Sequence, residues 1–142
     1  MTAKEYLQQA FMLDNRIRAR ERQLESLKEH AVYSTPQFDS EAKRSVLYKS
    51  RLEENAVKIV ELEKEIQQRV QEMVDLRREI QQTIKAINND EYETILEMRY
   101  LSFMTWDEIV AMLGYSRRNA FKLHGKALSL IHVPQQAERK AS

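Results

Sequence analysis

Side chains that could contact DNA are concentrated near the C-terminus, in a stretch that holds no acidic residue between positions 114 and 133. Arginine can form two hydrogen bonds with guanine, and asparagine can do the same with adenine. Lysine suits backbone phosphate, a contact that adds affinity but does not distinguish sequences. These residue types therefore predict a site for double-stranded DNA. The candidate DNA-binding residues are Ser116, Arg117, Arg118, Asn119, Lys122 and Lys126.

Two short helices joined by a tight turn are expected to position these side chains. Thr105 suits a helix N-cap, and Glu108, three residues later, completes a capping box. Gly114 stands where a helix ends on a left-handed residue, and Ser116 suits the next N-cap. This order is typical of a helix-turn-helix, in which the second helix enters the major groove of DNA. We expect that second helix to span residues 116–131.

The spacing within residues 116–131 separates an apolar face from a basic face. In a recognition helix the first turn reaches base edges and later turns reach phosphate. Base contacts are therefore expected from residues 117–119, and phosphate contacts from Lys122 and Lys126. Gly125 costs about 1 kcal/mol relative to Ala within a helix, and the sequence leaves open whether DNA or a neighbouring helix approaches it. The residues expected to pack inward are Trp106, Ala120, Leu123, Ala127, Leu128 and Ile131.

The charge of the chain changes sign within its C-terminal third. Residues 90–113 hold six acidic residues and one basic residue, whereas residues 114–133 hold four basic residues and no acidic one. Such an asymmetry favours a small domain with one side suited to phosphate. An ordinary solvated helix face is the alternative explanation for the basic residues.

The N-terminal part of the chain predicts an extended helical arm. Apolar residues recur at close to the ~3.5-residue repeat of coiled coils over residues 2–31 and again over residues 40–88. Pro36 lies between these stretches and predicts a turn, because proline interrupts a helix. We therefore predict an all-α fold, in which a long antiparallel helical hairpin, a coiled-coil-like arm, precedes a helix-turn-helix domain. The predicted parts are the arm in residues 1–89, the helix-turn-helix domain in residues 90–133 and a flexible tail in residues 134–142.

A difference in length between the two arm helices favours self-association. At 1.5 Å per residue the longer helix would extend roughly 70 Å and the shorter one roughly 45 Å. Part of the longer apolar stripe would then lack cover, including Ile80, Ile84 and Ile87. Either the C-terminal domain or a second chain must cover these residues. We expect a homodimer or a larger oligomer.

Short motifs in the C-terminal third resemble a known family. They are Leu96 with Arg99-Tyr100, Trp106-x-Glu108-Ile109, Leu113-Gly114-x-Ser116 and Lys126-Ala127-Leu128. Together these motifs, over residues 90–131, resemble region 4 of bacterial sigma-70-type factors. Val110 and Ala120 depart from the family pattern, which usually has Ala and Val at these positions. As a whole, the chain is similar to small phage- and prophage-encoded proteins of Gram-positive bacteria, and the resemblance implies late-gene transcription regulation.

Two classes of function follow from these observations. The first is a DNA-binding transcriptional regulator that recognises DNA with residues 116–131 and self-associates through the arm. The second is a structural or adapter protein that binds RNA polymerase, or another protein, through the region-4-like module. A DNA-packaging component similar to small terminase subunits is a variant of the second class, since such proteins also join a helix-turn-helix to a helical oligomerisation region.

The sequence argues against several other classes. It holds no Cys, its three His residues are not spaced as metal ligands, and no catalytic constellation or phosphate-binding loop is present. We therefore expect no enzyme activity, no metal and no cofactor. The N-terminus lacks the apolar segment of a signal peptide, and no apolar run is long enough to cross a membrane. A cytoplasmic protein without membrane association is the expectation.

Overall fold

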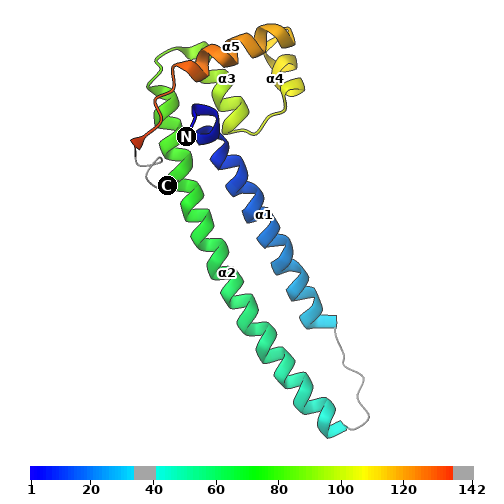
Figure 1. The fold of residues 1–142 in the computed structure, drawn as a ribbon. Helices are drawn as coiled ribbons and strands as arrows, with labels where there is room; N and C mark the ends of the chain where they lie inside the picture. Colours follow the sequence, from blue (N-terminus) through cyan, green and yellow to red (C-terminus); the bar gives the residue numbers. More distant parts are fainter. Residues whose placement is uncertain (34–40, 136–142) are drawn as a thin grey trace. The chain divides into compact units, whose positions relative to one another are not determined.

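The computed structural model describes residues 1–33 and 41–135, and these residues form α-helices joined by short connections, without strands (Figure 1). The predicted all-α class is confirmed. The turn predicted around Pro36 and residues 136–142 of the predicted tail lie outside the described residues. The helices are α1 (Ala3–Tyr33), α2 (Glu41–Lys85), α3 (Asp90–Tyr100), α4 (Trp106–Leu113) and α5 (Arg117–Ser129).

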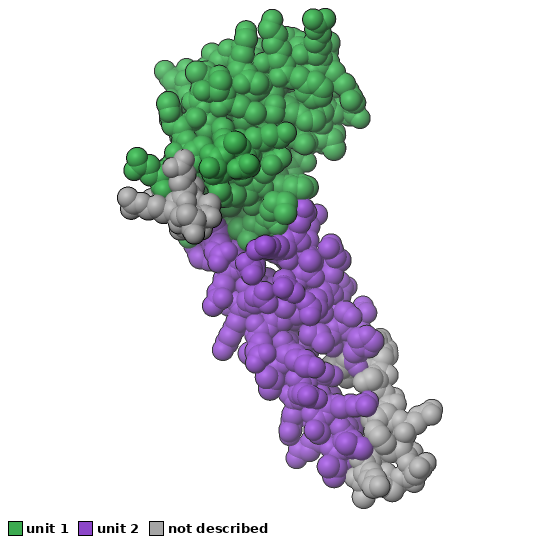
Figure 2. Space-filling model, in the orientation of Figure 1, with its two compact units in different colours: residues 1–14, 73–142 green, residues 15–72 purple. Residues whose placement is uncertain are grey.

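The chain divides into two compact units (Figure 2). Unit 1 comprises Met1–Asp14 and Met73–Ser142, and unit 2 comprises Asn15–Glu72. Unit 1 therefore contains the first turns of α1, the last turns of α2 and all of α3 to α5. The predicted domain boundary after residue 89 lies just beyond the end of α2. Unit 1 differs from the predicted domain because it also includes helical turns from both arm helices.

The core of unit 1 includes two of the isoleucines that were expected to need a partner. Ile80 and Ile84 are both 0% exposed, so residues of the same chain cover them. The first turns of α1 lie beside them, because the Tyr6 hydroxyl donates to Glu79 Oε2 at 3.0 Å and lies 3.3 Å from Thr83 Oγ1. A second chain is thus not required at this end of α2. The largest fully buried side chains are Tyr6, Leu7, Ile80, Ile84, Ile95, Leu96 and Ile109.

In unit 2, α1 and α2 are joined by ion pairs on the surface. Arg20 Nε lies 3.1 Å from Glu65 Oε1, and Lys28 Nζ lies 3.5 Å from Glu63 Oε1. The two ion pairs place the end of α1 at residue 33 opposite about residues 52–58, because antiparallel helices advance by the same rise per residue. Residues 41–52 therefore extend past the end of α1. The exposed apolar residues of this segment are Val46, Leu47, Tyr48 and Leu52.

Two asparagines determine the conformation of the turn between α2 and α3. α2 ends at Lys85, a few residues earlier than expected, and Asn88 then adopts a left-handed conformation with φ 58°. Asparagine is among the residues that tolerate this conformation best. The Asn89 side chain accepts a hydrogen bond from the Tyr92 amide at 3.1 Å and so caps α3. This turn starts α3 directly after the long helix.

Candidate nucleic-acid interface

Local interactions fix both ends of the connection between α4 and α5. Thr105 Oγ1 accepts from the Glu108 amide at 3.2 Å, and Ser116 Oγ accepts from the Asn119 amide at 3.1 Å. Gly114 is left-handed, with φ 71° and ψ 21°, and its amide donates to the Val110 carbonyl. The predicted N-caps at Thr105 and Ser116 and the predicted end of the first helix at Gly114 are confirmed, whereas the Glu108 side chain forms no hydrogen bond that would complete the capping box with a described residue. The backbone of this connection therefore follows from the residue types that form it.

The inner face of α5 packs against α3 and α4. Ala120 and Ala127 are 0% exposed and Ile131 is 8% exposed, as the spacing predicted. Alanine at two of these positions lets the backbone of α5 approach its neighbours closely. Leu123 and Leu128 lie on the margins of this face and are partly exposed. The buried face fixes which side of α5 points outward.

An aromatic cluster joins α4 to α5. The Trp106 ring centroid lies 5.0 Å from that of Phe121 and 4.7 Å from that of His124, both in edge-on geometry. The Arg99 guanidinium lies 5.2 Å from the Trp106 ring centroid and donates to the Met104 carbonyl at 2.9 Å. Trp106 therefore connects α3 and α5, although it is partly exposed and not fully inside as expected.

His124 is a structural residue that the sequence did not identify. Its Nε2 lies 2.7 Å from the Tyr100 hydroxyl, which joins α5 to α3. Burial, with smaller contributions from the Lys4 and Arg99 charges, lowers the pKa of His124 to about 4. Burial likewise raises the pKa of Tyr100 to about 12. His124 stands four residues after Ala120, on the same helical face, and this spacing is the signal that could have placed it inside.

The outer face of α5 holds most of the predicted DNA-binding residues. Arg118, Asn119, Lys122 and Lys126 are all exposed. The side chains of Arg118, Lys122 and Lys126 form no ion pair with any residue that the structure describes. At about 100° per residue, this face lies opposite the buried alanines of α5. It is thus a charged surface available to an anion, whereas Ser116 serves as the N-cap of the helix.

Arg117 differs from the other predicted DNA-binding residues. Its Nη2 donates to Asp107 Oδ1 in the first turn of α4. The side chains are 60% and 75% exposed, so water screens the pair and it contributes little to stability. The ion pair nevertheless directs the Arg117 guanidinium toward α4. Arg117 therefore differs from the basic side chains of the outer face, which form no ion pair with a described residue.

The acidic side of the module also contacts the turn before α5. The Tyr115 hydroxyl donates to Glu91 Oε1 at 2.9 Å, and this hydrogen bond is the main cause that raises the pKa of Tyr115. Glu91 belongs to the first turn of α3. Glu91 is thus the acidic partner of Tyr115, as Asp107 is of Arg117, near the start of α5. Acidic and basic residues are thus in contact at this end of the module.

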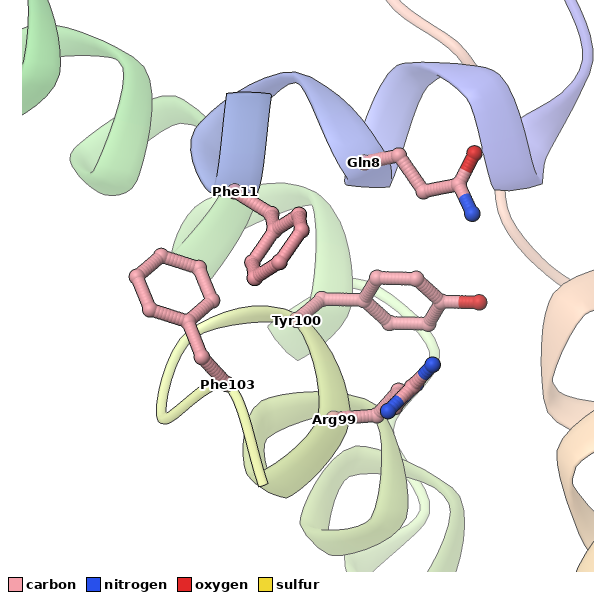
Figure 3. A pocket seen from close by; sticks show the side chains of 5 residues that line it. All are labelled: Gln8, Phe11, Arg99, Tyr100 and Phe103. Carbon is pink, nitrogen blue, oxygen red and sulfur yellow. The ribbon is translucent and has the colours of Figure 1, made fainter. Parts of the chain in front are cut away.

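A cavity of about 120 Å³ lies elsewhere in unit 1 (Figure 3). The rings of Phe11 and Phe103 pack edge to face with centroids 5.6 Å apart. Phe103 is left-handed, with φ 55°, a conformation that costs a bulky residue energy. None of the predicted DNA-binding residues lines this cavity. Its lining residues are Gln8, Phe11, Arg99, Tyr100 and Phe103.

Among residues 1–33 and 41–135, no group of three or more His, Cys, Asp or Glu side chains is arranged to hold a metal ion. None of the described helices combines the length and the apolar character that crossing a lipid bilayer requires.

A family model described as a protein of unknown function, DUF1492, matches residues 33–132. The chain belongs to the DUF1492 family. The matched segment includes α2 to α5 and therefore all of the candidate interface. The family description names no activity. A comparison with curated proteins found no match, and a comparison with solved structures found none either.

Proposed function

We propose that this DUF1492 protein is a DNA-binding transcriptional regulator that recognises double-stranded DNA with a helix-turn-helix formed by α4 and α5. The observation that carries the proposal is the outer face of α5. Arg118, Lys122 and Lys126 are exposed there and form no ion pair with a described residue, while the opposite face of the helix is buried. A short helix held by its apolar side, with unpaired cations on its other side, suits insertion into the major groove.

The residues of this face take different roles in the proposal. Arg118 and Asn119 lie in the first turn of α5, from which side chains reach base edges. Lys122 and Lys126 follow one and two turns later and bind backbone phosphate. Arg117 joins the base contacts once it leaves Asp107. The resemblance to sigma-70 region 4 supports a role in transcription, because that module contacts promoter DNA.

Fluorescence anisotropy with a labelled duplex tests this function. We expect the Arg118→Ala, Lys122→Ala double variant to bind DNA at least about tenfold more weakly than the wild type, since each contact is worth about 1–3 kcal/mol. The matched control is Arg78→Ala with Lys85→Ala, which removes the same charge from exposed positions of α2. Equal binding by the wild type and the α5 variant, or no binding by the folded wild type, would contradict the proposal.

Self-association through the arm is a separate part of the proposal. It is supported by the apolar segment of α2 beyond the end of α1, where Val46 is 68% exposed and Leu52 is 38% exposed. Coiled coils cover such stripes by pairing with another helix. Sedimentation velocity of the wild type and of Val46→Glu, Leu52→Glu tests it. We expect an oligomer for the wild type and a monomer for the variant, and a monomeric wild type would exclude this part.

A protein partner is the second candidate function, and one observation favours it. Met112, on α4, is 68% exposed and follows the acidic residue Glu108 by one helical turn. An exposed apolar side chain beside a carboxylate suits a protein surface better than it suits DNA. Co-purification with RNA polymerase in nuclease-treated extract, lost in Met112→Glu, would support this adapter role. A ring of many subunits in native mass spectrometry would instead favour a DNA-packaging component.

A further inference from the structure

We propose that Gly125 is the point where the DNA backbone approaches α5 most closely, with a phosphodiester lying over the glycine and beside Lys122 and Lys126. This inference rests on the proposed function, because it assigns a contact within the same basic face. It adds Gly125, a residue without a side chain, to the proposed DNA-binding residues. The chemical class of the ligand is the sugar-phosphate backbone of duplex DNA, not the edge of a base.

The fold itself does not require glycine at this position. Gly125 lies inside α5 with ordinary helical geometry, and Gly114 is the described glycine with positive φ. A Cβ added at Gly125 would meet no atom within 4 Å. Within residues 1–33 and 41–135, no neighbouring helix therefore approaches it, and an alanine would fit. Since glycine costs about 1 kcal/mol relative to alanine in a helix, the residue lowers the stability of α5 without a packing reason.

The position of Gly125 on the helix indicates what approaches it. At about 100° per residue, it falls on the same face as Arg118 and Lys122, and Ser129 follows one turn later. This face lies opposite Ala120 and Ala127, which are fully buried. Glycine allows the close approach of another backbone, because nothing projects beyond the main chain. The cations on one side of Gly125, which are Arg118, Lys122 and Lys126, are complementary to a polyanion.

A phosphodiester over Gly125 would place its charge near two ammonium groups. Lys122 stands three residues before the glycine and Lys126 directly after it, and neither forms an ion pair with a described residue. Phosphate contacts fix the position of a protein on the duplex but carry no sequence information. A side chain at position 125 should therefore weaken binding to all duplexes by a similar factor. Loss of a base contact would instead affect some sequences more than others.

The test combines a stability measurement with DNA binding by the full chain. We expect Gly125→Ala to raise the urea midpoint of unfolding and to bind a mixed-sequence duplex about tenfold more weakly at fixed salt. Gly125→Leu should bind more weakly still, because its side chain holds the backbone further away. Thr94→Ala is the matched control, since it favours a helix of the same unit at an exposed position of α3, away from the basic face. We expect its DNA affinity to equal that of the wild type.

The outcomes separate this inference from the proposed function. Wild-type affinity in Gly125→Ala and Gly125→Leu, together with weak binding by Arg118→Ala, Lys122→Ala, would overturn the role of Gly125 and leave the proposed function intact. Absence of DNA binding by the folded wild type would overturn both. A lower urea midpoint for Gly125→Ala would show that the fold requires this glycine, and would also contradict the inference.

Discussion

Arg117 of α5 and Asp107 of α4 form an ion pair that links the first turns of the two helices. The pair engages the arginine that the sequence places first in the proposed recognition helix. Arg118, one residue later, has no such partner among the described residues. Because both members of the pair are exposed, its contribution is about 0–1 kcal/mol and DNA can displace the carboxylate. In the proposed complex with DNA, Asp107 would therefore compete with DNA for Arg117.

Removal of the Asp107 charge should strengthen DNA binding. In Asp107→Asn the Arg117 guanidinium is free to contact DNA, and a carboxylate near the duplex is lost. We expect the affinity for DNA to rise by a factor of about three to ten at low salt, with a steeper dependence on salt. The measurement is anisotropy across a salt series.

Glu108→Gln is the control for this prediction. It removes one negative charge from the neighbouring exposed residue, whose side chain forms no ion pair with a described residue. An equal gain of affinity in Asp107→Asn and Glu108→Gln would mean that only net charge matters. The competition between Asp107 and DNA for Arg117 would then be refuted.

The caps between α4 and α5 should contribute measurably to stability. Ser116→Ala removes the acceptor of the Asn119 amide and should lower the free energy of unfolding by about 1 kcal/mol. Gly114→Ala should cost about 1–2 kcal/mol, since a left-handed alanine is strained at φ 71°. Urea titration followed by Trp106 fluorescence provides the measurement. Ser50→Ala, at an exposed site inside α2, should leave the midpoint unchanged or raise it slightly.

The stability of unit 1 should decrease as the pH falls toward 4. The pKa of His124 is lowered to about 4 in the folded chain, against 6.5 for an unperturbed histidine. Between these values the unfolded chain binds a proton that the folded chain excludes, so the free energy of unfolding falls with falling pH. Above about pH 6.5 this contribution is constant. Thermal melts between pH 4 and pH 7 measure the effect.

Two variants isolate His124 from the carboxylates that titrate in the same range. His124→Gln keeps a polar partner for the Tyr100 hydroxyl but cannot titrate, so its Tm should vary less with pH. His132→Gln changes an exposed histidine and should retain the wild-type pH profile. If His124→Gln showed the same slope as the wild type, another group would have to account for the pH dependence.

Trp106→Ala should destabilise unit 1 more than any single change at the basic face. The ring contacts Phe121, His124 and the Arg99 guanidinium, and all three contacts would be lost. We expect a loss of about 2–3 kcal/mol, less than for a fully buried tryptophan because Trp106 is partly exposed. Circular dichroism melts provide the measurement. Phe121→Ala, at a position that is 46% exposed, should cost distinctly less, and equal losses would contradict the anchoring role.

Local features of the chain could be predicted from the sequence, because they depend on a few adjacent residues. The N-caps at Thr105 and Ser116 and the left-handed Gly114 follow from residue type and spacing alone. The buried positions Ala120 and Ala127 follow from the helical period. The all-α class follows in the same way from the long apolar repeats and the scarcity of turn residues.

Features that join distant segments could not be predicted in this way. Nothing near Ile80 in the sequence indicates that the first turns of α1, some seventy residues earlier, cover it. The hydrogen bond between Tyr100 and His124 and the ion pair between Arg117 and Asp107 depend on the angle at which helices cross. Such angles are set by side-chain packing over a whole interface, which a periodic pattern does not specify.

Unit 1 is discontinuous in the sequence, since Met1–Asp14 and the chain from Met73 onward build one core. In an unfolded chain, closing the intervening loop costs about 3–4 kcal/mol of entropy by the logarithmic length scaling. Pairing of the α1 and α2 segments in unit 2 shortens the loop that must be closed. It holds the two segments that lead into unit 1 close together before the core of unit 1 forms. Folding is then expected to begin in residues 15–72. A fragment limited to the residues that the family model matches would lack Tyr6 and Leu7, and its core would remain open to water.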